Sequence, residues 1–222
     1  DTFTGIESVS GSRFAGDILT GSGGDNSLYG NAGNDELSGL GGDDYLEGGE
    51  GNDIIAGGTG NDQIFGGEGN DTIRFARGDG ADIVQESSAA SYNDTVEFLD
   101  GIAAQQLWFA RSGDDLVVSI IGTTDSITVT GWYLDGEPTA IDSFVTAAGD
   151  TLTADKVEAL VDAMAGLTPP ALGETELPDT LETALLPALA TAWSQYIEGT
   201  DGDDVLTGGF ASDEIRAFDG ED

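Results

Sequence analysis

The chain has 222 residues, with 43 acidic and only 6 basic side chains, a formal net charge of −37, and neither histidine nor cysteine. These counts exclude a Ser-His-Asp triad, a histidine-bound zinc, disulfides and thiolate chemistry. Six basic residues are too few for a nucleic-acid footprint, an anionic membrane surface would repel the chain, and no apolar run is long enough to span a bilayer. Because so much like charge opposes compaction, a bound cation is the simplest way for this chain to fold.

After residues 1–11, a nine-residue repeat runs without a gap from Ser12 to Arg74. Glycine fills position four in six of the seven copies, and position eight is aliphatic in every copy, from Leu19 to Ile73. Position six is acidic in six copies and holds, in order, Asp17, Asn26, Asp35, Asp44, Asp53, Asp62 and Asp71. A solvated acidic linker would show no such register, so the repeat predicts a regular structure.

The repeat favours a parallel β-solenoid. The two or three residues around each aliphatic side chain are expected to form a short strand, and the glycine-rich remainder a turn. Two copies then make one coil of 18 residues with a strand on each side, and residues 1–11 are expected to cap the N-terminal end. One inward aliphatic residue per copy gives a thin core, so burial alone is a weak source of stability.

The acidic register supplies the missing stabilisation. Position-six residues recur every 18 residues along each edge of the stack, where their carboxylates would repel one another without a cation between them. Free turn carbonyls add further oxygen ligands, a mixture that suits Ca²⁺ better than Mg²⁺. Seven copies give five sites if each ion lies between copy n and copy n+2. The charge of five divalent ions would balance the net charge of residues 12–74, which contain 12 acids and 2 arginines.

These nonapeptides resemble the repeats-in-toxin (RTX) family, also called haemolysin-type calcium-binding repeats, with the pattern GGxGxDxUx. The resemblance implies a calcium-bound parallel β-roll, about five or more ions, and ligands from position six and from backbone carbonyls. Carried over, the pairs are Asp17 with Asp35, Asn26 with Asp44, Asp35 with Asp53, Asp44 with Asp62 and Asp53 with Asp71. The carbonyl donors would include Gly33, Gly42, Gly49, Gly51, Gly58 and Gly60. Asn26 lacks a charge, and Arg13, Phe14 and Ala15 make the first turn irregular.

A closing segment follows the repeats and completes the roll over residues 12–93. Asp79 and Asp82, within FARGDGADIVQE, are expected to fill the last open edges as further ligands, the alternative being an ordinary surface turn.

Residues 94–166 are predicted to form a small antiparallel sheet with one helix. Alternating runs predict strands at Asp94–Phe98, Gln106–Phe109, Leu116–Ile121, Ser126–Tyr133 and Ile141–Val145. Thr153 is a suitable N-cap, and the helix after it would bury Val157, Leu160, Val161 and Met164. This stretch resembles the haemolysin-type calcium-binding-related domain, which implies company with RTX repeats and no catalytic residues. The fold class is therefore mainly β, a calcium-bound β-roll followed by a small β/α domain.

The C-terminal part combines a linker with a second set of repeats. Residues 167–198 contain a proline-bearing acidic linker and a predicted helix from Thr180 to Ile197, which docks on its own domain in preference to a partner. From residue 199 to 222 the nonapeptide returns, as the start of a second block cut short by the chain end. Its position-six candidates for calcium are Asp204, Asp213 and Asp222.

The leading functional hypothesis is a non-enzymatic, calcium-responsive module of a large secreted bacterial protein, whose neighbours are other repeat blocks of the same chain. The resemblance implies type I export in an unfolded state and an extracellular or cell-surface location. The alternative is an adhesin, surface-layer or glycan-binding accessory module, with cationic contacts from Arg13, Arg74, Arg77 or Arg111. A hydrolase would need a carboxylic acid with a raised pKa in a pocket, whereas the register explains these acids as ligands.

Overall fold

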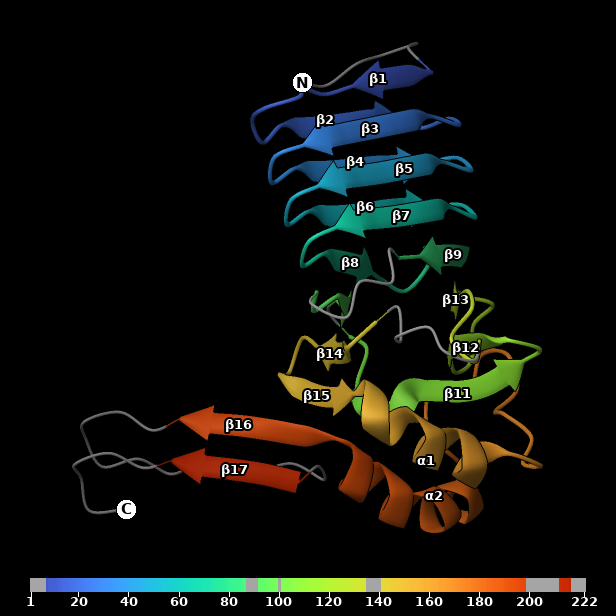
Figure 1. Cartoon of the computed structure of the whole chain (residues 1–222). Coiled ribbons are helices and arrows are strands. Elements are labelled where there is room, and N and C mark those ends of the chain that lie inside the picture. The colour runs from blue at the N-terminus through green and yellow to red at the C-terminus, as the bar shows by residue number, and fades with distance from the viewer. Residues whose placement is uncertain (1–6, 87–91, 100, 135–140, 199–211, 217–222) are drawn as a thin grey trace.

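A computed structural model describes residues 7–86, 92–99, 101–134, 141–198 and 212–216. Two sheets face each other along one long stack, and two helices close its far end (Figure 1). One sheet has the strand order β1(Ser8–Ser10), β3(Ser27–Ala32), β5(Tyr45–Glu50), β7(Gln63–Glu68), β9(Ala81–Gln85), β13(Ser126–Val129), β12(Asp115–Ile120) and β11(Leu107–Ser112). The other has the order β17(Ser212–Arg216), β16(Ser194–Glu198), β15(Asp150–Thr153), β14(Ser143–Thr146), β10(Thr95–Phe98), β8(Thr72–Phe75), β6(Ile54–Thr59), β4(Glu36–Gly41) and β2(Ile18–Ser22).

The repeats form the predicted β-roll. Successive strands of each sheet pair in parallel with an 18-residue offset, as in Leu19 opposite Leu37 and Leu28 opposite Leu46. All seven position-eight side chains are buried, with at most 5% of their surface exposed. The prediction of two- to three-residue strands is wrong, because β3 to β7 each have six residues. Each of these strands continues through positions one to three of the following copy, where position one is always glycine.

The strands after residue 94 extend the sheets of the roll instead of building a separate antiparallel sheet. β10 lies parallel between β8 and β14, and β13 lies parallel beside β9. Antiparallel pairing, as expected for this region, begins only at β12–β13, β11–β12 and β14–β15. The last coil of a roll leaves two strand edges unpaired, and the following strands satisfy them.

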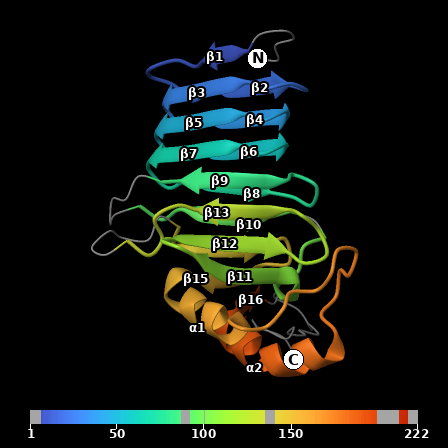
Figure 2. The same ribbon diagram turned by 90° about the vertical axis from the view of Figure 1, so that its right-hand side faces the viewer.

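The far end of the stack has a wider, aromatic core. It contains Phe98, Phe109, Phe144 and Trp193, with ring centroids 5.7–6.4 Å apart along the series. The helix α1(Ala154–Met164) starts after Thr153 and buries the four predicted side chains, and the short helix η1(Ala104–Gln106) precedes β11. Figure 2 shows both main helices packed below the sheets. Of the described helices, none is both long and apolar enough to cross a membrane.

The helix predicted from Thr180 to Ile197 ends earlier in the structure. The helix α2(Asp179–Ala192) contacts α1 and contains Pro187, and it ends before Trp193. Residues 194–198 instead form β16, because they pair with the free edge of β15.

A second parallel pair begins at β16. Ile197 lies opposite Ile215 in β17, the same 18-residue offset as in the first roll. Asp213 falls in β17, and Asp204 and Asp222 lie outside the described residues. This pairing places the first strand of the second block before residue 199.

Candidate metal sites along the edges of the roll

One carboxylate oxygen of each position-six aspartate closes the ladder between coils. The Oδ1 atom of Asp53 accepts a hydrogen bond from the Asp35 backbone N–H at 2.7 Å, and the Asp53 N–H donates to Asp71 Oδ1 at 2.8 Å. The same bond links Asp17 to Asp35, Asn26 to Asp44 and Asp44 to Asp62, at 2.6–2.7 Å. These bonds orient every carboxylate alike, so the other oxygen, Oδ2, has a fixed direction.

The second oxygens are buried and lack hydrogen-bond partners. Across the described residues, this holds for the Oδ2 atoms of Asp35, Asp44, Asp53, Asp62 and Asp71. Each of these five side chains has at most 2% of its surface exposed. A buried anionic oxygen without a partner is costly, and a cation is the ligand that would satisfy it. These residues therefore fit the calcium ions that the repeat predicts.

Glycine at position one makes room for each of these oxygens. A side chain built at Gly48 would place its Cβ 2.6 Å from the Gly66 carbonyl oxygen and 2.9 Å from Asp53 Cγ. The carboxylate and the carbonyl of the next coil thus converge on one small space, and both are oxygen ligands of the kind that Ca²⁺ prefers.

The predicted carbonyl donors all have left-handed backbones; Gly49 and Gly58 lie within β5 and β6, and the other four lie between strands. Gly33, Gly42, Gly49, Gly51, Gly58 and Gly60 all have φ between 97° and 149°. The carbonyl oxygens of five of them (all but Gly58) lie directly against the equivalent glycine of the next coil. Asn31 and Leu40 occupy position two with φ values of 78° and 76°, which is unfavourable for residues with a side chain.

Burial raises the pKa of the position-six carboxyls. The pKa values of Asp44, Asp53, Asp62 and Asp71 rise to about 6, because desolvation outweighs the backbone hydrogen bonds that lower them, and neighbouring carboxylates raise them further. The pKa of Asp35 is raised for the same reason. Without a cation, charge on these groups opposes the fold.

The ladder continues beyond the repeats. Asp82 Oδ1 accepts from the Asp62 N–H at 3.0 Å, while the Asp79 carboxylate accepts from the Ala76 N–H at 2.6 Å within its own turn. On the other edge Asp94 and Asp142 extend the ladder, with bonds of 2.8 and 3.0 Å. The repeat pattern does not predict either residue as a ladder member, because each follows an interruption of the nine-residue spacing.

A second ladder at position five was also missed. Asn34, Asn52 and Asn70 accept from the backbone N–H of position five one coil later, at 2.8–3.0 Å. Asp25 and Asp43 do the same on the opposite edge, both at 2.9 Å. The signal was visible, because position five is Asn or Asp in six of seven copies.

Three of the four arginines considered for glycan contacts have partners within the chain. Arg74 forms an ion pair with Glu97 at 2.9 Å, Arg77 donates to the Ile121 carbonyl, and the Arg111 guanidinium lies 4.2 Å from the Tyr133 ring centroid. Their side chains serve the fold, so they give no particular support to glycan binding.

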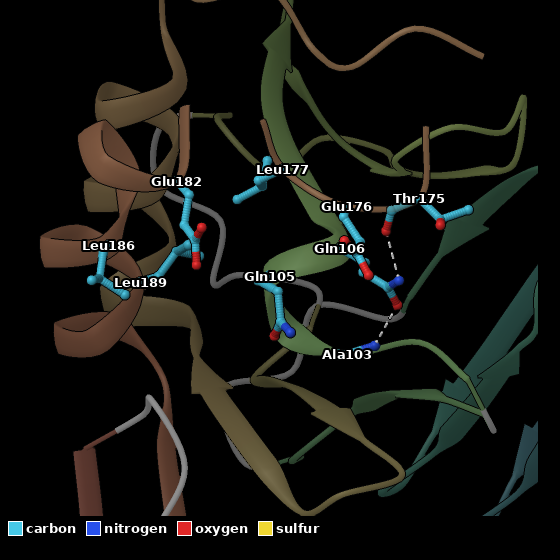
Figure 3. A pocket seen from close by; sticks show the side chains of 9 residues that line it. All are labelled: Ala103, Gln105, Gln106, Thr175, Glu176, Leu177, Glu182, Leu186 and Leu189. Atoms are coloured by element: carbon cyan, nitrogen blue, oxygen red, sulfur yellow. Dashed lines mark hydrogen bonds between the residues drawn. The ribbon is translucent and has the colours of Figure 1, made fainter. Parts of the chain in front are cut away.

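A cavity of about 290 Å³ lies between η1 and α2 (Figure 3). Gln106, which lines one side of it, accepts from the Ala103 N–H and donates to the Thr175 carbonyl. Its two carboxylates, Glu176 and Glu182, are exposed to solvent.

Within the described residues, no three acidic side chains gather as a metal cluster. The candidate sites therefore differ from carboxylate cages: each combines one or two acidic side chains with backbone carbonyls.

Comparison with known families agrees with this arrangement. The RTX calcium-binding nonapeptide repeat matches residues 15–46, 38–73, 47–84 and 196–222, and the haemolysin-type calcium binding protein related domain matches 115–156. The last repeat match begins within β16 and includes β17, and the match to the related domain is shorter than the expected 94–166.

Two solved structures resemble the chain at low similarity. The extracellular lipase LipA from Serratia marcescens is 22% identical, with a TM-score of 0.36 over 58% of this chain and 19% of the lipase. The AlgE6R3 subunit of the Azotobacter vinelandii mannuronan C5-epimerase is 24% identical, with a TM-score of 0.22 over 76% of this chain and 92% of that one. Such low scores carry no argument about function.

Proposed function

Since the chain belongs to the RTX calcium-binding repeat proteins, with a haemolysin-type calcium-binding-related domain behind its first repeat block, we propose that it is a module that folds on binding calcium. In this role it is a non-catalytic structural unit of a larger exported protein. RTX repeats bind calcium and occur typically in exported proteins.

The observation that carries this proposal is the set of five buried Oδ2 atoms without hydrogen-bond partners. They belong to Asp35, Asp44, Asp53, Asp62 and Asp71, which are the second members of the five pairs predicted from the sequence. We therefore assign about one Ca²⁺ to each of them. Ion binding offsets the burial of charge, so its free energy is gained only in the folded state.

The charge of the chain makes this folding conditional. In the fold the pKa values of position-six carboxyls such as Asp53 and Asp62 are raised to about 6. At neutral pH without calcium these groups are therefore charged, and their buried charge opposes folding. A chain that stays expanded in low calcium and compacts in high calcium suits export in the unfolded state, and the extracellular space or cell surface is the proposed location.

The test is a calcium titration of the whole chain freed of metal, followed by far-ultraviolet circular dichroism. The proposal expects a cooperative gain of β-structure in calcium and much less in magnesium, which holds its water and needs a small octahedral site. A spectrum that stays the same from chelator to millimolar calcium would contradict it.

A further inference from the structure

Glu86 lies where the repeat pattern has a glycine. The pairing of Phe65 with Gln85 sets Glu86 opposite Gly66, at position one of the next coil along β9. One coil earlier on the same edge, the backbone carbonyl of Gly66 meets the space beside Gly48 and Asp53. Glu86 therefore brings a carboxylate to a place where the inner coils have only a carbonyl. It lies outside the stretches matched by the two families.

The Glu86 carboxylate meets the unpartnered oxygen of Asp71. A side chain built at Gly66 would place its Cβ 2.5 Å from Glu86 Oε1 and 2.6 Å from Asp71 Oδ2. Two oxygens this close to one point are near enough to be ligands of one Ca²⁺, whose oxygen ligands lie at roughly 2.3–2.6 Å. Both carboxylates therefore converge on the small space that Gly66 leaves open.

Both oxygens are buried and unsatisfied. Glu86 has 9% and Asp71 1% of its surface exposed, and neither Glu86 Oε1 nor Asp71 Oδ2 has a hydrogen-bond partner among the described residues. Glu86 Oε2 accepts a 3.2 Å bond from the Gly67 N–H. Arg74 pairs with Glu97, and among the described residues neither Asp71 nor Glu86 forms an ion pair with a basic side chain. Two buried carboxylates side by side need a positive charge.

We propose that Asp71 and Glu86 form a two-carboxylate cation site for Ca²⁺ that ends the first roll. This inference rests on the proposed calcium-dependent function, and it gives the ion assigned to Asp71 a second carboxylate ligand that the other ions lack. Two carboxylates face this ion. In three inner coils, at Asp35, Asp44 and Asp53, the Oδ2 atom lies instead beside one backbone carbonyl of the next coil. Since the number of charged ligands tunes calcium affinity, this site binds more tightly than the inner sites.

The site also joins the roll to the chain that follows. The Asp71 N–H donates to Asp94 Oδ1, and Asp94, 3% exposed, directly precedes β10. An ion on Asp71 and Glu86 therefore holds the end of β9 beside the start of the next coil.

The test counts bound calcium on the whole chain by native mass spectrometry and measures affinities by calorimetry. Glu86→Gln is compared with Glu50→Gln, a matched loss of charge at an exposed position on the same sheet. The expected result is that one tightly bound ion disappears, or weakens by at least about tenfold, in Glu86→Gln and not in Glu50→Gln. Glu86→Asp, which keeps the charge but withdraws the oxygens, covers the case in which the amide variant fails to fold, and it should show the same loss.

Equal ion counts and affinities in the Glu86 variants and Glu50→Gln would overturn the site. If the unaltered chain neither binds calcium nor gains β-structure, the proposed function itself fails. If it does both while Glu86→Gln behaves like Glu50→Gln, only the two-carboxylate site fails.

Discussion

Replacing Asp53 by asparagine should change stability in opposite directions with and without calcium. Asp53 lies in the middle of the roll with 1% of its surface exposed, one oxygen bonded to the Asp35 N–H and the other without a partner. The amide can still accept the ladder bond but loses the charge, which weakens that bond by about 1 kcal/mol. Losing one ion at a hundredfold excess over its Kd removes about 2.7 kcal/mol more. In calcium, Asp53→Asn should therefore lower the free energy of unfolding by about 3 to 4 kcal/mol.

Without calcium the sign reverses. Burial raises the pKa of Asp53 to about 6, so at neutral pH its charge opposes the metal-free fold, and an amide removes that cost. We expect Asp53→Asn to be neutral or more stable than the unaltered chain in chelator. The assay is urea unfolding followed by circular dichroism, in saturating calcium and in chelator.

The matched control is Asp43→Asn, at position five. Asp43 is exposed, and asparagine already makes the equivalent ladder bond at Asn34 and Asn52. This variant should shift the free energy of unfolding by less than about 0.5 kcal/mol in either condition. The reasoning is refuted if Asp53→Asn matches this control in calcium.

Three further outcomes follow from the same geometry. Gly48→Ala should lower the free energy of unfolding of the calcium-bound fold by about 2 kcal/mol or more in urea, because its Cβ would lie 2.6 Å from a carbonyl oxygen. Gly24→Ala should have little effect, because a Cβ built at Gly24 meets nothing within 4 Å. Equal losses of stability in the two variants would contradict this. Leu40→Gly should raise the melting temperature by relieving a left-handed backbone at a half-exposed residue, a gain of up to about 1 kcal/mol, and a lower melting temperature would count against it. Calcium-free chain should gain β-structure on acidification, because carboxyls such as Asp62 have a pKa of about 6 in the fold against an ordinary value of 3.8: their favourable contribution is complete below 3.8 and is lost as the pH rises through 6. Circular dichroism of metal-free protein between pH 4 and pH 8, roughly the window these values define, checks this, and an unchanged spectrum would oppose it.

The repeat could be predicted in detail because its constraints are local and periodic. Leu19 to Ile73 recur every nine residues, which fixes the coil length, the parallel pairing and the inward face before any contact is known. The same periodicity located the position-six acids. It could not show which carboxylate oxygen bonds the backbone and which stays free, because that depends on side-chain geometry between coils.

The end of the roll was harder to predict because its partners are distant in sequence. Asp142 continues the ladder of Asp94 across 48 residues, and Glu86 reaches Asp71 only through the pairing of β7 with β9. The joining of β10 and β13 to the sheets of the roll depends on the unpaired edges that its last coil leaves. Alternation in sequence predicts a strand, but it does not say which edge the strand will cover.

Calcium ions should lie against the free oxygens of the position-six aspartates. Crystals grown in calcium and measured for anomalous scattering would locate them. We expect an anomalous peak at roughly 2.3–2.6 Å from Oδ2 of each of Asp35, Asp44, Asp53, Asp62 and Asp71. Oδ2 atoms with no peak beside them, in crystals whose roll is nevertheless folded, would contradict it.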